Sequence, residues 1–255
     1  MQLNEVKAIV TGGVSGLGLA VARKIVVAGG QAVLLDINDA GGAAAIAELG
    51  DAVSYIRTDV SNEQAVIDAV KTAVGRMGMI NVAMNCAGII GAGRVLGRAA
   101  PMALDFFTKV IQVNLVGSFN VCKAAGAAME SNPAGADGER GVIISTASVA
   151  AYDGQIGQAA YSASKAGIIG MTLPIAREFA RFGVRINTIA PGIFWTPMAD
   201  GMPEHVQESL AASVPFPSRL GKPEEFADLA AHIMENGYIN GETIRLDGAV
   251  RLAPK

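Results

Sequence analysis

A chain of 255 residues with a formal net charge of -3 lacks the basic excess that binding to the phosphate backbone of nucleic acids requires. Its length suits one α/β domain with a large core, and we expect a single domain over residues 1–255. Hydrophobic residues make up 51% and charged residues 17% of the sequence, an apolar content that favours burial of surface between subunits.

Short apolar runs alternate with longer stretches of helical periodicity along the whole chain. The runs predicted as strands span residues 7–11, 32–36, 53–57, 80–85, 142–146, 184–189 and 243–246. The stretches predicted as helices span residues 16–28, 62–74, 104–130, 158–181 and 223–234. Because the strand runs are apolar without period-two alternation, they are typical of parallel strands that helices cover on both faces. The sequence therefore predicts a Rossmann-type, doubly wound parallel α/β sheet of about seven strands.

A glycine-rich segment follows the first predicted strand and opens the first predicted helix. It reads Thr11-Gly12-Gly13-Val14-Ser15-Gly16-Leu17-Gly18. Glycines here allow a tight turn and a close approach to a pyrophosphate, while the helix N-terminus offers free N–H groups to the anion. The spacing G-x-x-x-G-x-G differs from the G-x-G-x-x-G of the usual dinucleotide fingerprint. The segment indicates a dinucleotide site when other signals in the chain agree with it.

Asp36 ends the second predicted strand, where a carboxylate can accept hydrogen bonds from the adenosine ribose hydroxyls and would repel a 2′-phosphate. The nearby Ser15, Ile37 and Asn38 supply no cation that would compensate. Alternatively, Asp36 is only a turn residue at a strand end. Its position after a glycine loop favours the first interpretation, and we predict NAD rather than NADP.

Two further strand ends carry polar or small residues at the edge where open α/β sheets bind ligands. Asp59 follows the third predicted strand, and Asn85-Cys86-Ala87-Gly88 ends the fourth. Small residues there would admit a flat cofactor. Ordinary turn chemistry explains the same residues without a ligand.

Tyr161 and Lys165 are four residues apart on a predicted helix and therefore share one face. A neighbouring ammonium group favours the phenolate and lowers the tyrosine pKa from its usual value of about 10, which would let Tyr161 act as a base. Ser148, which follows the fifth predicted strand, can donate a hydrogen bond to a substrate oxygen as charge develops there. The alternative is a surface tyrosine beside a solvated lysine, and the nucleotide-binding pattern upstream argues against it.

Read together and in this order, the motifs resemble those of the short-chain dehydrogenase/reductase family over nearly the whole chain. The resemblance implies hydride transfer between a nicotinamide and a secondary alcohol or ketone, catalysed by Ser148, Tyr161 and Lys165. It also implies that Asn114 holds a water that connects Lys165 to solvent. The cofactor contacts that it implies are Thr11, Gly12, Ser15, Gly16, Leu17, Gly18, Asp36, Asp59, Val60, Asn85, Ala87, Gly88, Tyr161, Lys165, Pro191, Gly192, Ile193 and Thr196.

Residues 193–220 are predicted as a substrate loop. Its apolar residues are Phe194, Trp195, Met198, Met202, Leu210, Val214 and Phe216. Such a stretch suits a lid over a lipid-like substrate. The same side chains can instead pack a helical excursion onto the core.

Three segments resemble the family members that oxidise (S)-3-hydroxyacyl-CoA to 3-ketoacyl-CoA, namely residues 141–171, 214–221 and 240–249. This likeness implies an acyl-CoA thioester as substrate, with Gln155 and Gln158 as substrate contacts beside Ser148 and Tyr161. Residues 89–104 depart from it, because they are shorter than in those members and lack their lysines. Only Arg94 and Arg98 remain there, as diphosphate ligands or as solvated charges.

Two other functions stay open. One is a steroid, short-chain alcohol or hydroxy-acid dehydrogenase with the same catalytic residues, and the other is a cofactor-binding scaffold without turnover. His205 and His232 have no Cys or His partner nearby in the sequence, so we assign neither a metal nor a catalytic role to them. The resemblance also implies a homotetramer, with residues 105–130, residues 158–181 and the C-terminal segment at the interfaces.

The cysteines and the N-terminal residues predict a cytoplasmic location. Cys86 and Cys122 are too few for the disulfide framework of a small secreted domain, so we expect both to be reduced and buried. The first predicted strand begins by Val6, which leaves no room for a signal peptide. The chain also lacks an apolar run of the roughly 18 residues that a membrane span needs. We therefore expect a soluble protein without a membrane partner.

Overall fold

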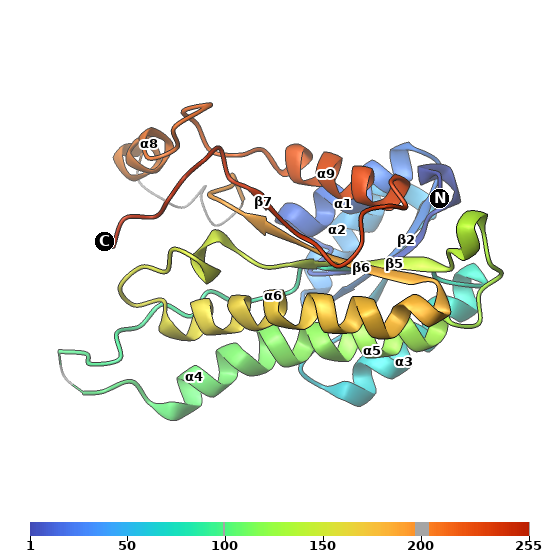
Figure 1. Ribbon diagram of the computed structural model, residues 1–255, viewed down its shortest axis with the longest axis horizontal. Coiled ribbons are helices and arrows are strands. Elements are labelled where there is room, and N and C mark those ends of the chain that lie inside the picture. Colours follow the sequence, from blue (N-terminus) through green and yellow to red (C-terminus); the bar gives the residue numbers. More distant parts are fainter. Residues whose placement is uncertain (99, 197–203, 255) are drawn as a thin grey trace.

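The structure is a computed structural model, and it describes residues 1–98, 100–196 and 204–254. Its centre is a parallel sheet of seven strands in the order β3-β2-β1-β4-β5-β6-β7, as Figure 1 shows. The strands are β1 (Lys7–Thr11), β2 (Gln31–Asp36), β3 (Val53–Arg57), β4 (Val82–Asn85), β5 (Gly141–Thr146), β6 (Val184–Pro191) and β7 (Thr243–Leu246). The predicted doubly wound sheet is confirmed, and each strand lies where the apolar runs predicted it.

The helices in the described residues are α1 (Gly16–Val27), α2 (Asp39–Leu49), α3 (Glu63–Met77), α4 (Leu104–Ile111), α5 (Gly117–Met129), α6 (Ala159–Phe179), α8 (Glu204–Ala212) and α9 (Pro223–Glu235). The single helix predicted over residues 104–130 is divided by a π-helical turn, Gln112–Val116. We did not predict α2, because two glycines near its start lower its helix propensity. Its N-cap compensates, since the Asn38 side chain accepts a hydrogen bond from the Gly41 N–H at 3.0 Å. None of the described helices has the length and apolar character to cross a membrane.

Alternate residues of each central strand face opposite hydrophobic clusters. Val10 of β1 packs in one cluster with Ile25 of α1 and Phe226 of α9. Ile9, its neighbour on β1, packs in the other cluster with Val66 of α3 and Val121 of α5. Helices α1 and α9 therefore cover one face of the sheet and α3 and α5 cover the other, as Figure 1 shows.

The strand order reverses between β1 and β4, which is the position where open α/β sheets bind ligands. From β1 the chain proceeds to β2 and β3 on one side, and from β4 it proceeds to β5, β6 and β7 on the other. The carboxyl ends of the strands lie at the left in Figure 1, where α6 begins and where α8 and the end of the chain are found. Residues far apart in the sequence thus gather at one edge.

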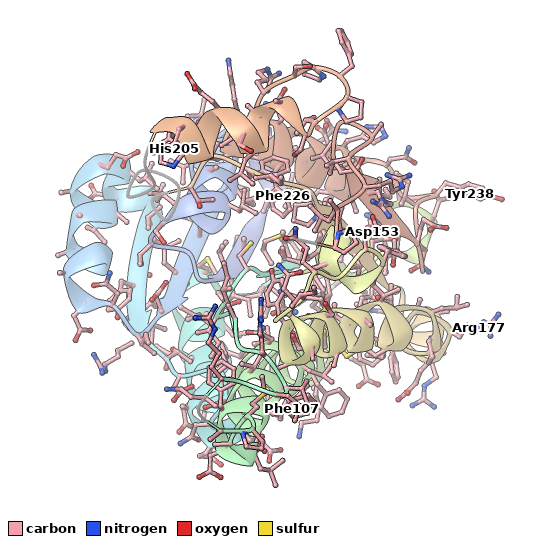
Figure 2. The ribbon with its side chains drawn as sticks, turned by 90° about the vertical axis from the view of Figure 1, so that its left-hand side faces the viewer. Phe107, Asp153, Arg177, His205, Phe226 and Tyr238 are labelled. Carbon is pink, nitrogen blue, oxygen red and sulfur yellow. The ribbon has the colours of Figure 1, made fainter. Side chains whose placement is uncertain are left out.

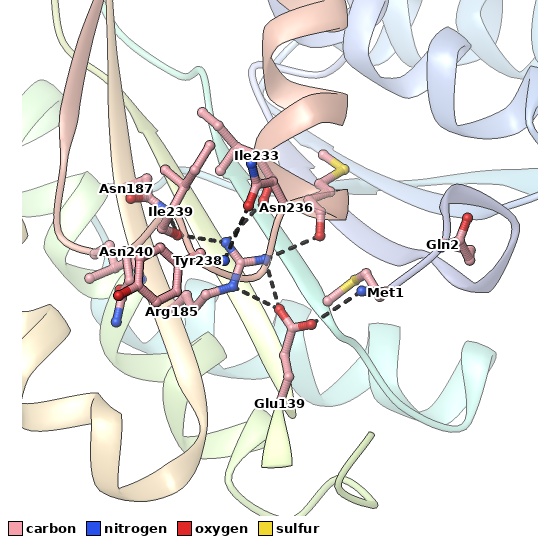
Figure 3. A network of polar contacts seen from close by, with 12 residues as sticks. Met1, Gln2, Glu139, Arg185, Asn187, Ile233, Asn236, Tyr238, Ile239 and Asn240 are labelled. Atoms are coloured by element: carbon pink, nitrogen blue, oxygen red, sulfur yellow. Dashed lines mark hydrogen bonds and ion pairs between the residues drawn. The ribbon is translucent and has the colours of Figure 1, made fainter. Parts of the chain in front are cut away.

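Arg185 organises a buried network at the opposite end of the sheet, which Figure 3 shows from close by. Its guanidinium forms an ion pair with Glu139 at 2.7 Å, and Glu139 also accepts a hydrogen bond from the Met1 amino group at 3.2 Å. The guanidinium further donates hydrogen bonds to the carbonyl oxygens of Ile233, Met234 and Ile239, at 2.9, 3.1 and 2.8 Å. The network joins β6, the segment before β5 and the end of α9.

Replacing Arg185 with methionine should lower the free energy of unfolding by about 3–5 kcal/mol, because it leaves three carbonyl groups without their partner and removes one of the two cations that the Glu139 carboxylate binds. Denaturant unfolding followed by circular dichroism measures the change. The matched control is Arg177→Met on α6, an exposed side chain that points outward in Figure 2, and it should change stability by less than about 0.5 kcal/mol. Equal stabilities of the two variants would contradict the assignment of a structural role to Arg185.

Candidate active site

The segment between β1 and α1 turns tightly at the carboxyl edge of the sheet. Gly12 has a φ of 61°, and a Cβ atom there would lie 2.8 Å from the Ala87 nitrogen. A Cβ atom on Gly18 would lie 2.3 Å from the Gly12 carbonyl oxygen. Both positions therefore require glycine. Helix α1 begins at Gly16, and because the Ser15 side chain makes no capping hydrogen bond, the N–H groups of the first turn are available to an anion.

Thr11 joins the ends of β1 and β4 at the reversal of strand order. Its Oγ1 accepts hydrogen bonds from the N–H groups of Cys86 and Ala87, both at 3.2 Å. Asn85 Nδ2 donates to Ser145 Oγ at 3.3 Å, while its buried Oδ1 has no hydrogen-bond partner within the described residues. The predicted cofactor residues at the two strand ends thus lie beside the glycine turn.

The structure shows one of the two interpretations that the sequence left open for Asp36, the turn role. One of the Asp36 carboxylate oxygens, Oδ1, accepts a hydrogen bond from the Asn38 N–H at 3.1 Å. The sheet register places Asp36 beside Arg57, whose guanidinium binds Asp39 at 2.7 Å and the Ile37 carbonyl at 3.0 Å. We missed this cation because it lies on the neighbouring strand, and only the pairing of β2 with β3 reveals it.

The structure places Asp59 and Val60 in the turn after β3. The Asp59 carboxylate accepts hydrogen bonds from the Ser61 N–H and hydroxyl at 2.9 and 2.7 Å, so it serves the turn. Val60 is buried, and a Cβ atom on Gly117 of α5 would lie 2.6 Å from it. The lack of a side chain at Gly117 thus allows α5 to pack closely against Val60.

The segment after β6 runs from Pro191, the last residue of that strand, through Gly192 and Ile193 to Thr196. Gly192 donates its N–H to the Leu246 carbonyl at 2.9 Å, and the Ile193 carbonyl accepts a hydrogen bond from the Gly221 N–H at 2.9 Å. Residues 197–203, with Met198 and Met202 of the predicted substrate loop, lie outside the described residues. Beyond them, Val214 is buried against Val149, whereas Phe216 is 82% exposed. The predicted loop therefore contains both core-packing and exposed apolar residues.

Ser148, Tyr161 and Lys165 meet at the carboxyl end of β5. Ser148 precedes a short 3-10 turn, Val149–Ala151, and its Oγ accepts a hydrogen bond from the Ala150 N–H at 3.1 Å. A side-chain hydrogen bond also links Ser148 to Tyr161. The Lys165 ammonium lies 5.7 Å from the centroid of the Tyr161 ring and donates to the Thr146 carbonyl at 2.7 Å. The structure thus brings together three side chains that come from two elements.

Burial shifts the pKa values of this pair in opposite directions. It raises the pKa of Tyr161, and the hydrogen bond with Ser148 offsets this only in part. It lowers the pKa of Lys165 to about 8, while the nearby Cys86 thiol acts in the other direction. The pKa of Tyr161 is therefore not lowered as we expected, because burial outweighs the other influences on the phenol.

Asn114 lies in the π-helical turn and is fully buried. Its Oδ1 accepts a hydrogen bond from the Ile89 N–H at 2.8 Å, and its Nδ2 donates to the Ile89 carbonyl at 3.0 Å and to Ser164 Oγ at 3.1 Å. A Cβ atom on Gly88 would lie 3.2 Å from Asn114 Oδ1 and 3.7 Å from Lys165 Nζ. Asn114 thus holds the segment after β4 close to Lys165.

The predicted substrate glutamines hydrogen-bond each other. The Gln155 N–H donates to Gln158 Oε1 at 3.0 Å, and Gln155 Nε2 donates to the carbonyl of Ala253 at 3.0 Å. A groove of about 510 Å³ lies beside them, lined by Arg94, Val95, Leu96, Ile156 and Gly157. Arg98 is also exposed but does not line the groove. The sequence did not indicate the contact between Gln155 and the C-terminal residue Ala253.

Neither histidine belongs to these clusters. His205 is exposed on α8, and the ring of His232 lies 3.3 Å from the side chain of Asn236. In the part of the chain that the structure describes, no group of His, Cys, Asp or Glu side chains is arranged to hold a metal ion. Burial raises the pKa of both Cys86 and Cys122 to about 11, so the two free thiols stay protonated at neutral pH.

Comparison with known proteins agrees with this geometry. The family model described as short chain dehydrogenase matches residues 6–207. The chain is 51% identical to the 3-hydroxyacyl-CoA dehydrogenase type-2 of Homo sapiens, over 97% of this chain and 95% of that protein. It is 48% identical to the Drosophila melanogaster protein of the same name, over 96% and 97%. The crystal structure of 3-hydroxyacyl-CoA dehydrogenase type-2 from Mycobacterium avium superimposes with a TM-score of 0.92 at 42% identity, over 97% of this chain and 96% of that one. The chain therefore belongs to the short-chain dehydrogenase family, whose members are oxidoreductases that generally use NAD(P).

Proposed function

We propose that this protein interconverts a secondary alcohol and a ketone, with Ser148, Tyr161 and Lys165 as its catalytic residues. The observation that supports this most strongly is the convergence of these three side chains at the end of β5. Strand β5 lies next to β4, and β4 lies next to β1, which the glycine turn follows. Asn114 is the proposed fourth residue, which would hold a water next to Lys165. When bound, the nicotinamide cofactor supplies the acceptor for the hydride.

During oxidation, Tyr161 Oη takes the hydroxyl proton of the substrate while Ser148 Oγ donates a hydrogen bond to the substrate oxygen. The Tyr161 phenol must first lose its own proton, which burial opposes by raising the pKa. The Lys165 ammonium, 5.7 Å from the ring centroid, stabilises the phenolate by its charge. With a pKa of about 8, Lys165 also exchanges its proton with solvent near neutral pH.

We propose NAD rather than NADP as the cofactor. The turn at Gly12 and Gly18 and the free N–H groups of α1 fit a pyrophosphate. The Asp36 carboxylate suits the ribose hydroxyls, and Arg57, the cation nearest in the sheet register, already binds Asp39. The other proposed cofactor contacts are Thr11, Ser15, Gly16, Leu17, Asp59, Val60, Asn85, Ala87, Gly88, Tyr161, Lys165, Pro191, Gly192, Ile193 and Thr196.

We propose (S)-3-hydroxyacyl-CoA as the substrate. Relatives with 48 and 51% identity carry the name 3-hydroxyacyl-CoA dehydrogenase type-2. The groove beside the glutamine pair combines the cation of Arg94 with the apolar side chains of Leu96 and Ile156, which suits a ligand with both a diphosphate and an acyl chain. Gln155 and Gln158 are its other proposed contacts. The same apolar walls would fit a steroid or another apolar alcohol, which is the alternative substrate class.

The experiment that tests the proposal is a steady-state screen that follows reduction of the cofactor. It compares (S)-3-hydroxyacyl-CoA thioesters, hydroxysteroids, hydroxy acids and simple secondary alcohols, each with NAD and with NADP, by kcat/KM. We expect the highest kcat/KM for a CoA thioester with NAD. A steroid or simple alcohol with a higher value would contradict the substrate class, and a preference for NADP would contradict the cofactor. Absence of turnover with every compound would favour the scaffold alternative.

Replacing Arg94 and Arg98 together with alanine should raise KM for the CoA thioester by at least about tenfold, because even one charge-assisted contact to a phosphate contributes about 1.5–3 kcal/mol. The matched substrate is the N-acetylcysteamine thioester of the same acid, which lacks the CoA phosphates. Its KM should not change in the variant. An unchanged KM for the CoA thioester would contradict a role of these arginines in binding CoA.

We further propose that the protein is a cytoplasmic homotetramer. A cavity of about 300 Å³ lies between α5 and α6 and is lined in part by Phe119, Phe179 and Phe182. Phe119 is 47% exposed, and burial of such rings against a second copy is favourable.

Free Cys86 and Cys122 agree with a reducing compartment. Sedimentation velocity tests the oligomeric state, and cell fractionation tests the location.

A further inference from the structure

Arg245 of β7 connects three parts of the chain at the edge of the sheet that holds the proposed active site. Its guanidinium donates to the Asp153 carboxylate at 2.7 Å, to the Asp247 carboxylate at 2.7 Å and to the Val250 carbonyl at 3.0 Å. It also lies 4.9 Å from the centroid of the Tyr152 ring. Arg245 thus holds the segment after β5 against the segment that follows β7.

The segment that Arg245 holds begins at Ser148. The N–H groups of Tyr152 and Asp153 both donate to the Val149 carbonyl at 2.9 Å, so the chain from Ser148 to Asp153 forms one hydrogen-bonded turn. In Figure 2, which views the carboxyl edge of the sheet, Asp153 lies between α6 and the C-terminal elements. A force on the Asp153 carboxylate therefore acts on the turn that orients the Ser148 hydroxyl.

The C-terminal segment makes further contacts with the same part of the chain. Val250 and Leu252 pack against Val149, the residue after Ser148. The Ile156 N–H donates to the Pro254 carbonyl at 3.0 Å, and Ile156 is one of the residues that line the groove. Both the serine and one wall of the groove are therefore attached to the segment that Arg245 anchors.

Burial distinguishes Arg245 from its neighbour Arg251. The side chains of Arg245, Asp153 and Asp247 are 22, 22 and 9% exposed, so their charges are poorly screened by solvent. The Arg251 side chain is 61% exposed and contacts Asp247 at 3.3 Å and the Val250 carbonyl at 2.7 Å. Arg251 therefore shares the C-terminal contacts of Arg245 but makes no hydrogen bond to the segment after β5. This pair of arginines provides a matched comparison.

We propose that Arg245 is a positioning residue, which by binding Asp153 holds Ser148 and the groove wall at Ile156 in the arrangement needed for substrate binding and turnover. The inference rests on the proposed function, because it assigns Ser148 to the reaction. Arg245 acts through the Ser148–Ile156 segment and does not itself contact substrate. It adds a determinant of substrate geometry outside the proposed catalytic, cofactor and substrate contacts.

The kinetic test compares Asp153→Asn and Arg245→Gln with Arg245→Lys and Arg251→Gln. Asp153→Asn and Arg245→Gln should lower kcat/KM for the alcohol by at least about tenfold, since small displacements of reacting groups have effects of this size, while Kd for NAD stays within about twofold. Arg245→Lys, which keeps the charge on Asp153, should recover part of the loss. Arg251→Gln should resemble the unmodified protein. A similar loss in Arg251→Gln, or a parallel loss of NAD affinity in Arg245→Gln, would overturn the proposal.

Hydrogen exchange of the amides at Tyr152, Asp153 and Ile156 tests the same proposal without any activity. These amides should exchange at least about tenfold faster in Asp153→Asn than in the unmodified protein, whereas amides of β1 and β4 should be unchanged. Unchanged exchange at all three amides would overturn the positioning role. If the unmodified protein oxidised no alcohol, the proposed function would fail, and the exchange rates would still decide whether Arg245 holds this segment.

Discussion

Replacing Tyr161 with phenylalanine should lower kcat for alcohol oxidation by about 10²–10⁴-fold, which is the usual contribution of a positioned acid–base group. The variant lacks the only atom that can take the substrate proton at this position, yet it keeps the ring that packs beside Lys165. Kd for NAD should therefore change by less than about twofold, because one hydroxyl contributes little to the binding of a large cofactor. Stopped-flow measurement of the rate and calorimetric titration with NAD give the two quantities.

Tyr238→Phe is the matched control for that experiment. The Tyr238 side chain is fully exposed between α9 and β7, so the same loss of a hydroxyl should leave kcat unchanged. Activity of Tyr161→Phe comparable to that of the unmodified protein would refute the proposed mechanism. Parallel losses of turnover and NAD affinity would instead mean that Tyr161 supports the cofactor site.

Replacing Gly18 with alanine should lower the free energy of unfolding by about 3 kcal/mol and weaken NAD binding by more than about tenfold. The new Cβ atom would lie 2.3 Å from the Gly12 carbonyl oxygen, and relief of that overlap requires the backbone of the glycine turn to move. Overpacking of this kind typically destabilises by about 1–3 kcal/mol, and here no flexible side chain can yield. Thermal unfolding and calorimetric titration with NAD measure the two effects.

Gly75→Ala in α3 is the control for Gly18→Ala. Gly75 is also helical, but a Cβ atom there would meet no atom within 4 Å. Alanine should therefore stabilise the protein by about 0.5–1 kcal/mol, since it has the higher helix propensity. If Gly18→Ala and Gly75→Ala had the same effect on stability and on NAD affinity, close packing at the glycine turn would not be the reason that Gly18 is glycine.

The sheet could be predicted because its signals are local. Each strand is an apolar run between turn residues, and each connection contains a stretch of helical spacing, so the alternation alone indicates a parallel sheet. Helix α2 could not be predicted in this way, because the glycines and alanines at residues 41–45 have no apolar periodicity. It is a helix because Asn38 caps it and because Gly42 fits against the ring of Tyr55.

The proposed site residues followed from the same local rules in some cases and not in others. Four-residue spacing places Tyr161 and Lys165 on one face of any helix, so their proximity needs no knowledge of the fold. The shift in the Tyr161 pKa could not be read from that spacing, because it depends on how deeply the packed protein buries the phenol. The position of Asn114 likewise depends on the π-helical turn, which the residue types in Gln112–Val116 do not predict.

The amino-acid sequence by itself determined the order of the strands and supplied the side chains that we propose for hydride transfer. The tertiary structure decided which of those residues meet. Sheet register set Arg57 beside Asp36, and the path of the chain after β7 brought Arg245 to Asp153 and Pro254 to Ile156. These contacts join residues about 20 to 100 positions apart, and spacing rules that extend over one helical turn or one strand cannot reach that far.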